Sequence, residues 1–236
     1  IDGGQLLDDI KKVGVANLMA RMLTQGTANK TPQELEEAIQ QLGASISVNA
    51  GSEETRINVT TLAKNYDATL ALVEEILLEP RWDAKEFALI KQGTLAQIRQ
   101  LDANPNAIAQ REFNALVYGK DNIRSHSILG TLDAVNAITL DDLKALYARG
   151  ISPSVSRMLV VGAIDKARVL SSLADLNKRW ASKKVDIPVY KTPTPPAKSQ
   201  VYFYDVPGAV QSVLRVGYPA MAQTDANFYP ATVANY

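Results

Sequence analysis

The chain is poor in the side chains that carry out most enzyme chemistry. Its 236 residues include a single histidine, His126, and no cysteine. A metal site built on two histidines, a disulfide and a thiolate nucleophile are therefore all excluded within this chain. His126 lies in the polar phrase Arg-Ser-His-Ser, where a histidine usually orders a loop or faces solvent instead of binding a metal.

Within residues 14–27, the sequence predicts a helix that faces a core and ends at Gly26. Its apolar residues recur at i, i+3, i+4, i+7 and i+8, and this spacing places them on one stripe of a helix. They are Val15, Leu18, Met19, Met22 and Leu23. Gly26 then supplies the left-handed residue with which such a helix commonly ends. Periodicity alone therefore describes an ordinary core helix.

The sequence of this segment resembles that of the signature helix of the pitrilysin/insulinase family of zinc metallopeptidases, which reads roughly G-L-A-H-x-x-E-H-M-L-x-x-G-T. In that motif the two histidines bind zinc, and the glutamate acts as general base on the metal's water. The frame of the motif is kept in Gly14, Ala16, Met22, Leu23, Gly26 and Thr27. The three chemical positions instead hold Asn17, Ala20 and Arg21.

The family's remaining zinc ligand is a glutamate on a later helix, in a phrase like E-I-x-x-x-x-D-x-P. The matching phrase here begins at Gln97 and reads Q-I-R-Q-L-D-A-N-P. Amides are poor zinc ligands, alanine has no base, and an arginine repels a metal ion. The resemblance therefore implies a non-catalytic member that binds no zinc, with zinc expected only in a catalytic partner half. An active peptidase with a different metal site is the least favoured alternative.

The composition limits the partners of the chain. Lys and Arg together number 25, as do Asp and Glu, so no overall field attracts nucleic acid or an anionic membrane. No apolar run approaches the roughly 20 residues of a membrane span. The apolar fraction of 46% is that of a globular protein with a real core.

Caps and periodicity predict an α+β fold, with an antiparallel or mixed sheet and helices packed on one face. A strand tail is expected within residues 1–9. Further strands are expected at 45–50, 55–62 and 155–161, and helices at 31–42, 65–78, 83–101, 105–117, 139–149 and 165–180. This order also resembles the pitrilysin/insulinase-type (LuxS/metallohydrolase-like) repeated unit.

Three regions are predicted along the chain. Residues 1–180 form the first unit, which lacks the zinc motif. Residues 181–199 are a proline-rich linker that contributes nothing to a packed core. Residues 200–236 are the opening of a second, truncated unit, with strands at 200–205 and 211–216 and a helix from Tyr229 onward. There Val-Ala-Asn recurs at 233–235 after its first occurrence at 15–17.

The resemblance implies two functions for the chain. In the first, it forms chamber wall and peptide-binding surface opposite a catalytic half that carries H-x-x-E-H, in cis or in trans. Ser47, Val48 and Asn49 would then pair with the peptide backbone, although an ordinary sheet edge is the favoured interpretation of this strand. In the second, it is a structural or assembly subunit that binds no peptide. Arg21 either binds a carboxylate or the partner half, or fills the vacated site as an exposed residue. Bacterial relatives suggest the periplasm by analogy only.

Overall fold

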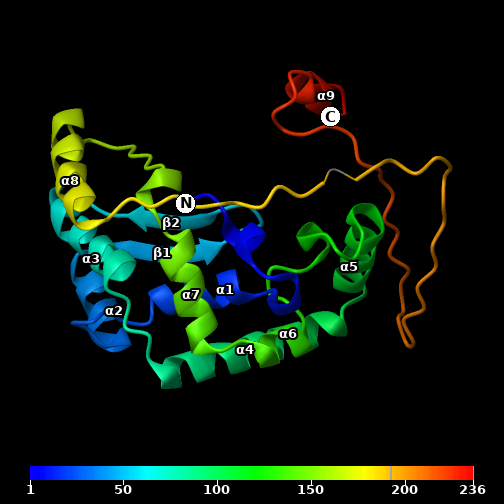
Figure 1. Cartoon of the computed structure of the whole chain (residues 1–236), viewed down its shortest axis with the longest axis horizontal. Helices are drawn as coiled ribbons and strands as arrows, with labels where there is room; N and C mark the ends of the chain where they lie inside the picture. The colour runs from blue at the N-terminus through cyan, green and yellow to red at the C-terminus, as the bar shows by residue number, and fades with distance from the viewer. Residues whose placement is uncertain (192, 236) are drawn as a thin grey trace.

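The computed structural model describes residues 1–191 and 193–235 and is drawn in Figure 1. Thr192, in the predicted linker, and Tyr236, at the end of the predicted second unit, lie outside the described residues. The strands are β1 (Ser45–Ala50) and β2 (Thr55–Thr60). The α-helices are α1 (Val15–Leu23), α2 (Pro32–Gln41), α3 (Tyr66–Leu78), α4 (Ala84–Asp102), α5 (Pro105–Tyr118), α6 (Leu132–Ala137), α7 (Leu140–Gly150), α8 (Lys166–Arg179) and α9 (Phe228–Ala234).

Local capping explains where several helices begin. Thr31 and Glu34 form a capping box at the start of α2, and Thr139 and Asp142 form one at the start of α7. The side chain of Asp83 accepts from two backbone N–H groups at the start of α4. These predicted helices are confirmed, with ends within two residues of those expected.

The sheet is an antiparallel hairpin in which Ser45 lies opposite Thr60 and Ala50 opposite Thr55. Helices α1 and α2 both contact β1. In Figure 1 these two helices lie along one side of the hairpin, whereas α5 and α9 lie apart from it. The predicted α+β class is confirmed. No helix in the described part of the chain is long and apolar enough to cross a membrane.

Helix α1 lies at the centre of the core, since it contacts α4, α7 and β1. One face of α1 packs into a cluster that includes Leu18, Met19, Leu95, Ile98, Leu143 and Leu146. The opposite side packs into a second cluster made of Ala20, Leu23, Leu35, Ile39, Val48, Leu72 and Ile76. Helix α1 is therefore buried on two sides, which leaves little freedom to change its side chains.

Three predicted strands are wrong. A short 3-10 turn at Pro153–Val155 ends at the first residue of 155–161, and the rest of that segment is irregular. Residues 200–205 and 211–216 are irregular as well. Their apolar side chains are exposed, for example 93% for Leu159 and 90% for Phe203. A strand requires a neighbour for its backbone hydrogen bonds, and none of these segments pairs with another strand among the described residues.

The predictions for residues 1–9 and for the linker at 181–199 also need correction. Within residues 1–9, only Asp2 forms a bridge, to Glu54, and a 3-10 helix follows at Gly4–Leu7. The linker does contribute to the core, because three of its apolar side chains pack against buried clusters, namely Val185, Ile187 and Tyr190. The short helix α6, capped by the Thr131 side chain, was not expected.

Candidate functional site

The start of α1 is fixed by a buried carboxylate. Asp8 accepts hydrogen bonds from the backbone N–H groups of Gly14 and Ala16, each at 2.8 Å. Gly14 adopts φ 114°, and a Cβ there would come within 2.8 Å of the Leu129 carbonyl oxygen, so glycine is required. Burial raises the pKa of Asp8 to about 7, although the two backbone donors act in the opposite direction.

Ala20, at the position of the family's general base, is part of the hydrophobic core. Its exposure is 0%, and it packs in the cluster that contains Leu23, Leu35 and Val48. Space that a reactive carboxylate would need is therefore filled by apolar side chains.

Arg21, at the second histidine position, is half-buried and tied to α4. Its Nη1 atom donates to Oγ1 of Thr94 at 2.8 Å. Thr94 has 0% exposure, and its hydroxyl in turn donates to the Ile90 carbonyl at 2.9 Å. The guanidinium has no ion-pair partner among residues 1–191 and 193–235. Arg21 thus joins the two helices that carry the motif positions.

The other two motif positions differ in their surroundings. The Oδ1 atom of Asn17 is buried and has no hydrogen-bond partner in the described part of the chain. Gln97 lies on α4, which packs against α1, and its side chain is exposed. The fold therefore brings the two helices together, while no hydrogen bond within the described ranges joins Gln97 to Asn17 or Arg21.

The side chains present do not fit a zinc ion. Asn17 and Gln97 offer neutral amides, and Arg21 places a fixed positive charge beside the position where a ligand would be required. Nowhere in the described residues do three His, Asp or Glu side chains gather in a way that could hold a metal ion. No catalytic step through zinc therefore follows from these residues.

Thr94→Val is expected to destabilise the fold by about 1–2 kcal/mol, because the nearly isosteric change removes the acceptor of the half-buried guanidinium. Urea unfolding followed by circular dichroism measures this cost. The control is the same change in an Arg21→Met background, where the cost should be smaller because the donor is already gone. Equal costs in both backgrounds would show that the Arg21–Thr94 bond contributes nothing.

The predicted peptide-binding residues lie in the middle of β1. Val48 is buried, Ser47 is half-buried and Asn49 is exposed, with Asn49 Nδ2 donating to Ser47 Oγ at 3.5 Å. The Thr55 N–H donates to the Ile1 carbonyl, so the backbone groups of Thr55 point away from β1. Thr55 lies opposite Ala50, and backbone groups alternate in direction along an antiparallel pair. The backbone groups of Ser47 and Asn49 therefore point toward β2. Only the backbone of Val48, among the three, faces the outer edge of β1.

Two residues important to this site are not apparent from the sequence motifs. Asp8 lies in a segment expected to be strand and loop, and its role depends on a turn that brings it to the start of α1. Thr94 is a polar residue on a buried face of α4. Such a residue within an apolar stripe is a usable sign of a buried hydrogen bond.

Two sequence models of known families match the chain. The model described as insulinase (peptidase family M16) matches residues 1–131, and the model described as peptidase M16 inactive domain matches residues 137–236. The first match covers both helices that carry the motif positions, α1 and α4.

Individual proteins with similar sequence or fold are longer than this chain. A Helicobacter pylori protein described as non-peptidase homolog YmxG is 22% identical over 201 residues, which are 85% of this chain and 46% of that protein. The crystal structure of a peptidase M16 inactive domain from Pseudomonas fluorescens has a TM-score of 0.75 at 23% identity, covering 83% of this chain and 47% of that one. The ferredoxin protease FusC, solved with Arabidopsis ferredoxin, has a TM-score of 0.68 at 17% identity, covering 84% and 22%.

These comparisons agree with the residues of the site. One match is to an inactive domain and one similar protein is described as a non-peptidase homologue. In this chain, every zinc-chemistry position of the signature helix holds a different residue. The chain spans about half or less of the length of these three proteins. It belongs to the insulinase family, peptidase family M16.

Proposed function

We propose that this chain forms chamber wall and peptide-binding surface opposite a catalytic half of the same family. This proposal rests on the signature helix, α1, which keeps its packing but not its zinc chemistry. The helix and its packing are kept, while Ala20 is absorbed into the core and Arg21 is bonded to α4. A domain that keeps this fold without zinc chemistry has to act through the shape and surface that it presents to other molecules.

Two further features support a surface that receives a peptide. The outer edge of β1 offers the backbone of Val48 and its neighbours at 46 and 50, which β2 does not use. The buried Asn17 Oδ1 atom is an acceptor without a donor among the described residues, and such an atom favours any partner that brings an N–H group. Both lie on elements that pack against each other, α1 and β1.

The proposal is tested by mixing the chain with a family member from the same source that carries an intact H-x-x-E-H. We expect the chain alone to bind no stoichiometric zinc and to cleave no peptide. With the partner, the two chains should co-purify, and hydrolysis of an unstructured peptide should exceed that of the partner alone. Chelator-sensitive cleavage by the chain alone would contradict the proposal.

Ile46→Pro tests the strand edge within this mixture. The change removes an outward N–H group and leaves the β1–β2 bonds in place, so an edge strand should tolerate it. We expect weaker peptide affinity, measured as a raised KM, with co-purification unchanged. Ile46→Val is the matched control, because it keeps the N–H group and most of the side chain. An unchanged KM for Ile46→Pro would favour the alternative, an assembly subunit that binds no peptide.

A further inference from the structure

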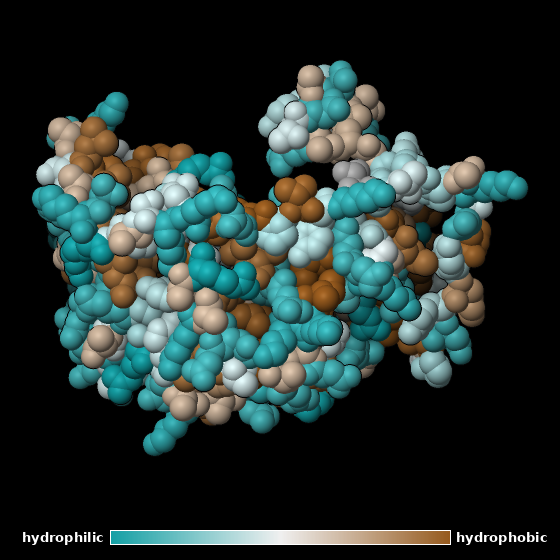
Figure 2. Space-filling model, in the orientation of Figure 1, coloured by the Kyte–Doolittle hydropathy of each residue, from teal (hydrophilic) through white to brown (hydrophobic). Residues whose placement is uncertain are grey.

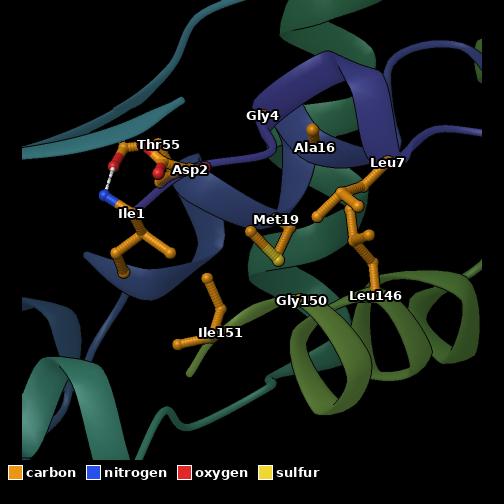
Figure 3. Close-up of a pocket in the computed structure, with 10 residues that line it drawn as sticks. All are labelled: Ile1, Asp2, Gly4, Leu7, Ala16, Met19, Thr55, Leu146, Gly150 and Ile151. Carbon is orange, nitrogen blue, oxygen red and sulfur yellow. Dashed lines mark hydrogen bonds between the residues drawn. The ribbon is translucent and has the colours of Figure 1, made fainter. Parts of the chain in front are cut away.

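Helix α1 presents one polar stripe between its two buried faces. Asn17, Arg21 and Thr24 recur on it at i, i+4 and i+7, and all three are half-buried. On another side of the helix, Ala16 and Met19 help to line an apolar pocket, shown in Figure 3, with a volume of about 10 Å³. This volume holds one water molecule at most. A ligand that contacts α1 therefore has to approach the polar stripe.

The Arg21 guanidinium uses only part of its hydrogen-bonding capacity. A guanidinium carries five N–H donors in one plane, and among the described residues that of Arg21 makes the single bond to Thr94 Oγ1. Two other half-buried arginines, Arg111 and Arg124, each contact a carboxylate oxygen at 2.6 Å. Arg21 has no carboxylate within ion-pair distance in residues 1–191 and 193–235. A partly desolvated guanidinium without an anion favours a ligand that supplies one.

Open space lies beside the free part of this guanidinium. Gly93 is exposed within α4, and a Cβ there would contact only Arg21 Nη2, at 4.0 Å. The atom bonded to Thr94 is Nη1, so Nη2 is the atom that faces this space. Glycine weakens the interior of a helix, and at this position it leaves the guanidinium uncovered.

The motif positions beside this space hold one positive charge and no negative charge. Arg21 is the cation, whereas Asn17 and Gln97 are neutral amides whose N–H groups can donate. Gln97 lies one turn beyond Gly93 on the exposed face of α4. Figure 2 shows hydrophilic side chains over most of the lower edge of the body, where α4 runs in Figure 1. Contacts to a ligand at this surface are therefore mainly polar.

The attraction for an anion at this place is local. Lys and Arg balance Asp and Glu at 25 each over the whole chain, so no overall field draws an acidic ligand to the protein. The guanidinium is also held in place before a ligand arrives, because Thr94 accepts from Arg21 and donates to the Ile90 carbonyl. Binding at a group that is already ordered loses little conformational freedom.

We propose that Arg21 and Gly93 form a subsite for a carboxylate group of the peptide, with the amides of Asn17 and Gln97 at its sides. The carboxylate accepts from Nη2 and from a free N–H group next to it, while Nη1 keeps its bond to Thr94. The inference rests on the proposed function and names the peptide chemistry that the surface selects. The carboxylate comes either from an acidic side chain of the peptide or from its C-terminus.

Three acetylated peptides that differ only in their carboxylates test the subsite on the full chain. The first has one internal glutamate and an amidated C-terminus, the second has glutamine instead and a free C-terminus, and the third has glutamine and an amidated C-terminus. Binding is followed by NMR through the Arg21 Nε–H signal, which is assigned by its loss in Arg21→Met. We expect a carboxylate to improve affinity at least about tenfold over the third peptide. The gain should come with a shift of the Arg21 signal, and the peptide that shows it identifies the source of the carboxylate.

Two variants at Gly93 test the same subsite without removing the bond between Arg21 and Thr94. Gly93→Glu places a carboxylate of the chain itself beside Nη2, and Gly93→Gln is the matched control with nearly the same size and no charge. Both residues favour a helix more than glycine does, so the fold should be kept. We expect Gly93→Glu, like Arg21→Met, to lose the preference for peptides with a carboxylate, and Gly93→Gln to retain most of it.

The outcomes separate this inference from the proposed function. Equal affinity of the parent chain for all three peptides would overturn the carboxylate subsite and leave the peptide-binding surface in place. A preference that persists in both Arg21→Met and Gly93→Glu would have the same meaning, because the carboxylate would then bind elsewhere on the chain. Failure of all three peptides to bind would overturn the subsite and the peptide-binding surface together.

Discussion

Ala20→Glu is expected to destabilise the folded chain by at least about 3 kcal/mol. Ala20 has 0% exposure and is surrounded by apolar side chains of α2, α3 and β1. A glutamate there must either bury its carboxyl group without a partner or force these elements apart. Urea unfolding followed by circular dichroism measures the loss directly.

Ala20→Gln separates charge from size in this experiment. Glutamine has nearly the same volume and no charge, so the part of the cost that both variants share is due to crowding and a buried polar group. The glutamate variant should approach the glutamine variant at low pH, where its carboxyl group is protonated. If Ala20→Glu stayed within about 0.5 kcal/mol of the parent, side chain 20 would have to reach solvent, contrary to its enclosure in the core.

The contribution of Asp8 to stability should fall as the pH rises. Burial raises the pKa of this carboxyl group from 3.8 to about 7 in the folded chain. Below about pH 4 the group is protonated in both folded and unfolded states. Between the two pKa values the folded state holds a proton that the unfolded state has lost, so stability decreases with pH until the folded group also ionises near pH 7. The total change is of the order of 4 kcal/mol.

Asp8→Asn isolates this effect, because asparagine does not titrate. Stabilities of the parent and the variant are measured by urea unfolding at several values between about pH 4 and pH 8. The parent should lose stability relative to the variant across this window, and the difference should level off above it. Other titrating groups are common to both chains and cancel. Parallel curves would mean that the two N–H donors from Gly14 and Ala16 offset the cost of burial.

Features set by local chemistry could be predicted from the sequence. The capping boxes at Thr31 and Thr139 involve residues three apart, so the helices after them were located closely. The hairpin of β1 and β2 followed from alternation across a short turn. Helix α6 was missed because six residues are too few to show a period.

Features set by distant contacts could not be predicted. Residues 155–161 have the composition of a strand, yet a strand forms only where another backbone pairs with it. Ile187 and Tyr190 lie in the predicted linker, and their partial burial depends on where Leu6, Val13 and Ile123 lie. For the site, the sequence indicated which side chains replace the zinc chemistry. It did not indicate that Ala20 is enclosed or that Arg21 reaches Thr94, since both depend on how α1 meets its neighbours.

The enclosure of Ala20 and the bond of Arg21 to Thr94 also bear on how this chain can evolve. Restoring the glutamate alone would cost stability before any catalysis returned, and restoring the histidine alone would break a contact between α1 and α4. Selection acts on each step separately, and a marginally stable protein tolerates few costly steps. The lost chemistry is therefore hard to regain one substitution at a time.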